Sequence, residues 1–214
     1  AISGVEVGTE RAWQLLEELN LPCAIFINKA DKEDADLEKV IADIQNILSK
    51  KALRIDSLEA AQLVEAIAES DDKLLEKYLE GVQLSTDELK AALRQAVIKR
   101  KVFPVLSGSA FTDKGTAELL DMVVECLPSP LERPIIEARD PLKPDQKKEV
   151  VPGEDSPFAA FVFKSISDPY VGQLTLIRIF SGSLLPNTGF YNVNKKTKER
   201  IGSIYMLQGK EQKQ

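Results

Sequence analysis

The chain has 214 residues, of which 43% are hydrophobic and 29% are charged, and its formal net charge is −6. This composition supplies enough apolar surface for a core and so excludes a disordered chain, and the negative charge excludes an indiscriminate nucleic-acid binder. The absence of histidine excludes Ser-His-Asp and Cys-His nucleophiles and most catalytic zinc sites.

The first 48 residues are expected to form a helix, a strand and a second helix. Residues 9–20 have helical periodicity, with Thr9 as the expected N-cap and Trp13 half-buried beside the apolar stripe. That stripe consists of Ala12, Leu15, Leu16 and Leu19. The continuous apolar run 23–27 predicts a parallel strand covered on both faces. The next helix is expected to bury Leu37, Val40, Ile41, Ile44, Ile47 and Leu48.

Residues 50–100 are expected to form a small helical insertion. Within it, Ser85 and Glu88 have the spacing of a capping box. A second apolar strand is predicted over 102–106, and a helix follows over 116–127. Strands that alternate with helices predict an α/β fold with a parallel sheet for residues 1–134.

The remainder of the chain has a different character. Residues 135–156 contain prolines among many charges, and this composition predicts a linker. Short β-prone runs then alternate with turn signals at intervals of about ten residues. These runs predict an incomplete antiparallel β-barrel over 157–214.

The sequence indicates a cytoplasmic protein. Residues 1–20 lack the pattern of a secretory signal, and the apolar runs are far shorter than the roughly 20 residues that cross a bilayer. Cys23 and Cys126 stand in apolar surroundings, and we expect them to be buried, reduced thiols.

The clearest functional motif is Asn28-Lys29-Ala30-Asp31, which directly follows the first predicted strand. Open α/β sheets bind ligands at the carboxyl ends of their strands. The carboxylate of Asp31 offers two acceptors at the spacing of the guanine N1–H and N2–H donors, a pair that adenine lacks. The Asn28 amide can bond the acceptor side of the base, and the stem of Lys29 can lie along the ring.

A second loop, Ser107-Gly-Ser-Ala-Phe111, follows the next predicted strand. Its small residues allow the backbone to approach a ligand, and we expect an N–H group here to reach the guanine O6. Ser109, Ala110 and Phe111 therefore complete the predicted guanine site. The alternative is that Asn28 and Asp31 only cap the following helix, as these residue types commonly do.

The combination of Asn28–Asp31 with Ser109-Ala110 resembles the base-recognition pair of P-loop GTPases. Further segments narrow the resemblance to bacterial elongation factor G or an elongation-factor-G-like paralogue. These segments are Ser3–Glu10, Glu76–Gly81, Gly108–Phe111, Leu127–Pro130, Phe161–Lys164, Asp168–Gly172 and Tyr205–Met206.

The resemblance covers nearly the whole chain. It implies that residues 1–134 are the C-terminal part of a GTP-binding domain and that residues 157–214 begin a β-barrel domain that faces the small ribosomal subunit. It also implies a parent protein that uses GTP or GDP with Mg²⁺, acts in translocation during protein synthesis, and binds ribosomal RNA and ribosomal proteins in the cytoplasm. DNA and membranes are not among the implied partners.

The sequence departs from the family in ways that concern catalysis. It contains no Gly-x-x-x-x-Gly-Lys-Ser/Thr loop for phosphates, and it lacks the Asp-x-x-Gly element and the histidine that position Mg²⁺ and water. The stretch between Leu48 and Glu59 is also shorter than in the family. We therefore expect a fragment that has no catalytic or metal-binding residues, does not hydrolyse GTP by itself, and can self-associate through uncovered strand edges.

Weaker signals lie near the C-terminus. Lys195, Lys196, Lys198 and Arg200 belong to a segment in which basic residues outnumber acidic ones, and they are candidates for contact with RNA phosphates. An ordinary solvated strand face explains them equally well. Two functions fit the chain as a whole: part of a ribosome-associated translational GTPase, or a non-catalytic ribosome- or protein-binding module that retains the GTPase scaffold.

Overall fold

The computed structural model describes residues 1–55, 61–69, 72–82, 84–132, 135–141, 143, 145–168, 172–209 and 211–213. The chain divides into two compact units, an N-terminal unit of residues 1–128 and a C-terminal unit of residues 129–214. Positions 169–171 of the segment Asp168–Gly172 lie outside the described residues. Within the described part of the chain, no helix is long and apolar enough to cross a membrane.

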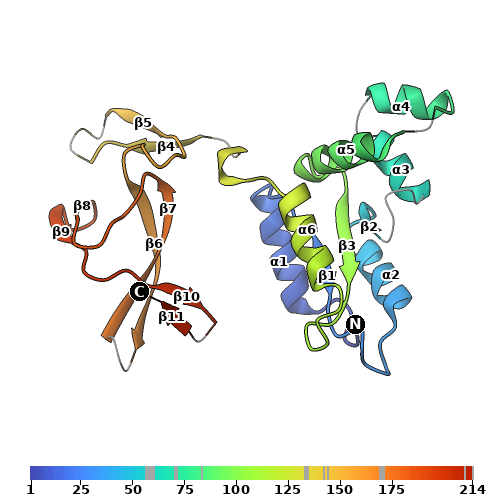
Figure 1. The fold of residues 1–214 in the computed structure, drawn as a ribbon, viewed down its shortest axis with the longest axis horizontal. Helices are drawn as coiled ribbons and strands as arrows, with labels where there is room; N and C mark the ends of the chain where they lie inside the picture. Colours follow the sequence, from blue (N-terminus) through green and yellow to red (C-terminus); the bar gives the residue numbers. More distant parts are fainter. Residues whose placement is uncertain are drawn as a thin grey trace. The chain divides into compact units, whose positions relative to one another are not determined.

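The N-terminal unit contains a three-stranded parallel sheet with helices around it (Figure 1). The strand order is β1 (Ile25–Ile27), β3 (Phe103–Ser107) and β2 (Ala52–Arg54), and both neighbouring pairs are parallel. The helices are α1 (Val7–Glu18), α2 (Leu37–Ile47), α3 (Ala61–Ala68), α4 (Asp72–Leu79), α5 (Thr86–Ile98) and α6 (Thr116–Cys126). The predicted α/β class of this unit is therefore correct.

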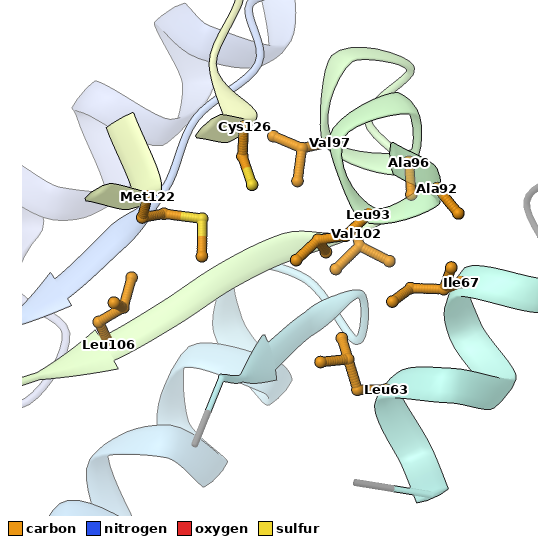
Figure 2. Close-up of a cluster of buried hydrophobic side chains, with 10 residues drawn as sticks. All are labelled: Leu63, Ile67, Ala92, Leu93, Ala96, Val97, Val102, Leu106, Met122 and Cys126. Carbon is orange, nitrogen blue, oxygen red and sulfur yellow. The ribbon is translucent and has the colours of Figure 1, made fainter. Parts of the chain in front are cut away.

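The core lies on both faces of the central strand β3. Phe103 and Val105 face α1 and α2, where the ring of Trp13 packs edge-on against Phe103 with centroids 4.8 Å apart. Val102 and Leu106 face a second cluster, which Figure 2 shows converging on β3 from α3, α5 and α6. The other members of this cluster are Leu63, Ile67, Ala92, Leu93, Ala96, Val97, Met122 and Cys126. A strand covered on both faces explains why this run is apolar throughout.

Pro104 lies in this central strand although it has no N–H to donate. Pairing of β3 with β1 begins at Val105, opposite Ile25, whereas Phe103 N bonds Lys51 O on the β2 side. Since no β1 residue pairs with position 104, proline removes no ladder bond there.

Helix α1 differs from its prediction in both its start and its buried face. The helix begins at Val7 after Glu6, so Thr9 lies in its first turn and is not the N-cap. Trp13 is 8% exposed, whereas Leu15 and Leu19 are 57% and 64% exposed. Trp13 and the half-buried Leu16 share the face toward the sheet, and the stripe through Leu15 and Leu19 consequently points elsewhere.

The capping box of α5 is present as predicted. Ser85 Oγ accepts a hydrogen bond from Glu88 N, and Ser85 N donates to Glu88 Oε2 at 3.0 Å. Lys77 Nζ of α4 donates to Glu88 Oε1 at 2.6 Å. This lysine contact first, and the bonds from Ser85 second, lower the pKa of Glu88 to about 2.

We expect Ser85→Ala to destabilise the N-terminal unit by about 1 kcal/mol, because the first turn of α5 loses its side-chain acceptor. Urea unfolding followed by the fluorescence of Trp13, the chain's sole tryptophan, measures this loss. Thr86→Ala is the matched control and should change stability by less than about 0.5 kcal/mol. Equal midpoints for the two variants would contradict the capping role.

Because the folded pKa of Glu88 is lowered, its stabilising effect is present above pH of roughly 4.3 and declines as the pH falls toward 2.

The C-terminal unit consists of antiparallel hairpins (Figure 1). A 3-10 turn at Pro130–Glu132 precedes them, and the paired strands are β4 (Ile136–Arg139) with β5 (Lys147–Val150), β6 (Ala159–Asp168) with β7 (Gly172–Ser181), β8 (Gly189–Asn192) with β9 (Thr197–Arg200), and β10 (Met206–Gln208) with β11 (Glu211–Lys213). The antiparallel prediction is correct. The described strands form separate two-stranded sheets, so they do not close a barrel.

The first hairpin lies within the segment that was expected to be a linker. Lys147 Nζ pairs with Glu137 Oε2 at 2.7 Å, and Lys148 Nζ pairs with Asp140 Oδ2 at 2.7 Å. The charges that suggested a linker thus lie on the paired strands or directly after β4, where ion pairs join the two strands.

Candidate functional site

The two candidate loops lie side by side at the carboxyl ends of β1 and β3. Ile27 pairs with Ser107, Gly108 N donates to Ile27 O at 3.1 Å, and Ala30 N donates to Gly108 O at 2.9 Å. The strand pairing therefore continues into both loops. It brings residues 28–31 against residues 108–110, as the sequence predicted for neighbouring parallel strands.

Asn28 connects the two loops through its side chain. Its Oδ1 accepts hydrogen bonds from Lys29 N at 2.7 Å and from Ala110 N at 3.0 Å. Lys29 has a positive φ of 64°, a left-handed conformation that is uncommon for a residue with a side chain. Because Asn28 Oδ1 already accepts these two hydrogen bonds, the amide nitrogen Nδ2 is the part of this side chain that can face a ligand.

Asp31 is exposed and bonded to the second loop. The Ser109 hydroxyl donates to its carboxylate, and this bond lowers the pKa of Asp31 and favours the ionised form. The N-cap of α2 is Asp36, whose Oδ1 accepts from Lys39 N at 3.0 Å. The alternative that Asn28 and Asp31 serve as the helix cap is therefore wrong.

Ser109 is the fixed point of the second loop. It is 1% exposed, its N donates to Lys114 O at 2.8 Å, and Lys114 N donates back to Ser109 O at 3.1 Å. Its Oγ also accepts from Thr112 N at 3.2 Å. Residues 109–114 consequently form a tight hairpin that holds Ser109 in place next to Asp31.

Ala110 and Phe111 differ from their expected arrangement. The Ala110 N–H, which we expected to be available to a base oxygen, is bonded to Asn28 Oδ1. Phe111 is 90% exposed, so the structure does not pack its ring against the other site residues.

Gly108 and Gly115 are structural members of the site; Gly108 lies within the predicted loop 107–111, whereas Gly115 was not among the predicted site residues. A Cβ at Gly108 would lie 2.1 Å from Lys114 O, and one at Gly115, whose φ is +81°, would lie 2.6 Å from Ser107 O. The sequence Asp113-Lys114-Gly115 could have indicated this turn, because aspartate and glycine are common turn residues.

The arrangement places an ionised carboxylate beside the Asn28 amide donor, whereas the Ala110 N–H already donates to Asn28 Oδ1. These groups can bind the polar edge of a planar molecule. Within the described ranges, no three His, Cys, Asp or Glu side chains gather into a group that could hold a metal ion.

The second candidate site lies on the hairpin of β8 and β9. Lys195 Nζ pairs with Glu199 at 3.0 Å, and Arg200 Nε donates to Asn187 O at 3.1 Å. Lys196 has a positive φ of 56° in the connecting turn, and Lys198 is exposed. The four predicted RNA-contact residues therefore lie on one hairpin, where Lys195 and Arg200 also make contacts within the protein.

Two family models match the chain. The elongation factor Tu GTP binding domain matches residues 1–129, and elongation factor G domain 2 matches residues 157–214. The chain is also similar to the crystal structure of a protein from Thermus thermophilus, ttk003000868, with 28% sequence identity and a TM-score of 0.75. That match covers 98% of this chain and 34% of the other, so the chain spans about a third of the length of that protein.

Proposed function

Since the chain belongs to the family of the elongation factor Tu GTP binding domain, we propose that it is part of an elongation-factor-G-like translational GTPase. In this proposal, residues 28–31 and 109–111 recognise the guanine base. The parent protein acts with the ribosome in the cytoplasm in GTP-dependent translocation.

The observation that supports base recognition is the pair of bonds between the two loops. A hydrogen bond from the Ser109 hydroxyl lowers the pKa of the Asp31 carboxylate, and Asn28 Oδ1 accepts from Ala110 N at 3.0 Å. The carboxylate would accept the N1–H and N2–H donors of guanine, and Asn28 Nδ2 would donate to N7. The Ala110 N–H would be shared between Asn28 and the guanine O6, and the stem of Lys29 would lie along the ring.

In this proposal the residues of this chain recognise the guanine base and do not hold the phosphates or Mg²⁺. The 214-residue sequence contains no Gly-x-x-x-x-Gly-Lys-Ser/Thr loop, and the described ranges contain no metal-binding cluster. Phosphoryl transfer depends on groups that position and neutralise the γ-phosphate. We therefore assign base recognition to this chain and assign phosphate binding and hydrolysis to other residues of the parent protein.

The test is a titration of the ¹⁵N-labelled 214-residue chain with GDP, followed by NMR. Hydrogen bonds of about 0.5–1.5 kcal/mol each, or up to about 3 kcal/mol to a charged group, are largely offset by the free energy of association. We expect millimolar binding with shifts at Asn28, Asp31, Ser109 and Ala110, and no hydrolysis of GTP. ADP at the same concentration is the control. Equal shifts with ADP would favour the alternative that the chain is a non-catalytic binding module. Micromolar binding of GDP, or hydrolysis of GTP, would show that this chain contains the phosphate site.

Two contacts of the parent protein are also proposals. The exposed side chains of Lys196 and Lys198, next to Lys195 and Arg200, suit ribosomal RNA phosphates. Strand β1 lies at one edge of the described sheet, and an uncovered edge can pair with a second copy of the chain.

A further inference from the structure

Two basic segments far apart in the sequence meet at the amino ends of β2 and β3. Lys51 immediately precedes β2, and Lys99-Arg100-Lys101 precedes β3. The hydrogen bond from Phe103 N to Lys51 O, 2.9 Å long, joins the two segments. Since both strands are parallel, this end of the sheet is opposite the loops of residues 28–31 and 108–110.

These side chains surround a hollow of about 250 Å³. We call it the basic hollow; Lys51, Lys99, Arg100 and Lys101 line it, together with Glu17 and Phe103. Glu17 is the single carboxylate among its described lining residues. Four cations around one carboxylate give a strongly positive surface on a chain whose net charge is −6.

Arg100 is fixed within the protein, and its charge is compensated. Its Nη2 pairs with Glu17 Oε1 at 2.7 Å, its Nη1 donates to Asn20 Oδ1 at 3.0 Å, and its guanidinium lies 5.5 Å from the centroid of the Phe103 ring. Lys99 and Lys101 are exposed, and neither has a carboxylate partner in the described part of the chain. Lys51 Nζ contacts Arg100 O at 3.5 Å. The lysines therefore supply the uncompensated positive charge.

The chemistry of the basic hollow favours a phosphate backbone over a protein partner. Protein interfaces are centred on apolar and aromatic side chains, whereas nucleic-acid contacts are polar and cationic. Phe103, the apolar residue of the described lining, is 2% exposed and already packs against Trp13. A partner would therefore meet lysine ammonium groups and little apolar surface.

We propose that the basic hollow binds the phosphodiester backbone of RNA through Lys51, Lys99 and Lys101. The contact is independent of base sequence, because point charges on lysines recognise phosphates. The choice of RNA over other polyanions rests on the proposed place of the parent protein at the ribosome. The site itself rests on the charge arrangement and does not depend on guanine recognition.

The test measures binding of a fluorescein-labelled 20-nucleotide single-stranded RNA to the 214-residue chain by fluorescence anisotropy, without nucleotide, between 50 and 200 mM salt. Each phosphate contact contributes about 0.7 to the slope of log K against log salt for single strands. The double variant Lys99→Gln/Lys101→Gln should therefore lower the slope by about 1.4. Over this salt range the unmodified chain should lose about sevenfold more affinity than the variant.

Three further variants make the result specific. Lys39→Gln/Lys90→Gln removes the same charge from exposed positions on α2 and α5 away from the basic hollow, and it should retain the original slope. Lys99→Arg/Lys101→Arg should also retain it. Any one of four outcomes would overturn the proposal. Three of them are no RNA binding at 50 mM salt, an equal loss of slope in Lys99→Gln/Lys101→Gln and in Lys39→Gln/Lys90→Gln, and a loss of slope only with Lys196→Gln/Lys198→Gln. Stronger displacement of the RNA by polyglutamate than by unlabelled RNA would indicate an acidic protein partner instead, and would also overturn it.

Discussion

Asp31→Asn in the full-length protein is expected to weaken GTP binding by about 100-fold or more and to favour xanthosine triphosphate. The Asp31 carboxylate presents two acceptors, and the Ser109 hydroxyl donates to it. An amide at this position presents one acceptor and one donor, so its NH₂ group would oppose the N2–H of guanine but would match the O2 of xanthine. Each hydrogen bond to the charged group contributes about 1.5–3 kcal/mol, and a loss of 2.7 kcal/mol corresponds to about 100-fold.

Competition between the two nucleotides for the purified protein measures this change of preference. Asp34→Asn is the matched control, because it makes the same chemical change three residues later on an exposed position. It should leave the affinity for both nucleotides within about twofold. If Asp31→Asn keeps the original preference for GTP, Asp31 does not contact the Watson–Crick edge of the base, and the proposed role of the loop is wrong.

The sequence predicted the strands of the N-terminal sheet where burial was continuous. In residues 23–27 and 102–106, the side chains toward both faces of the sheet are apolar. These two runs contain β1 and most of β3. The three residues of β2 were missed because so short a segment shows no periodicity, and only its hydrogen bonds to β3 define it.

Helix α1 shows a different limit of sequence periodicity. The spacing of Leu15 and Leu19 is as helical as that of Trp13 and Leu16, so the pattern alone does not select the buried face. The edge-on contact of Trp13 with Phe103 selects it, and this contact joins residues far apart in the sequence. The hairpin of β4 and β5 was missed for a related reason, since cross-strand partners such as Lys147 and Glu137 are defined only after pairing.

The loops of the candidate site were found because the motif residues directly follow their strands. The sequence predicted that Asn28 and Asp31 would lie near Ser109 and Ala110, and the structure brings these four residues together. It did not predict that the Ala110 N–H would be bonded to Asn28. That bond depends on the orientation of one amide, which the residue types do not determine.

Gly108→Ala is expected to destabilise the N-terminal unit by about 1–3 kcal/mol and to weaken guanine nucleotide binding by more than about tenfold. The added Cβ would lie 2.1 Å from Lys114 O and 2.8 Å from Phe26 Cζ. Phe26 can adjust its side chain, but Lys114 O is backbone and accepts the Ser109 N–H at 2.8 Å. Movement of Lys114 would therefore displace Ser109, and the hydroxyl that donates to Asp31 would move with it.

Two measurements separate the loss of stability from the loss of binding. Urea unfolding of the 214-residue chain, followed by Trp13 fluorescence, gives the change in stability, and nucleotide titration of the full-length protein well below its unfolding temperature gives the change in affinity. Gly8→Ala is the matched control, because Gly8 lies in α1 and a Cβ there would have no atom within 4 Å. It should be neutral or stabilise the unit by up to about 1 kcal/mol, because alanine is the better helix former. If Gly108→Ala unfolds like the unmodified chain and binds nucleotide equally well, the hairpin of residues 109–114 can move without disturbing Asp31. In that case the contact between Ser109 and Asp31 does not control base recognition.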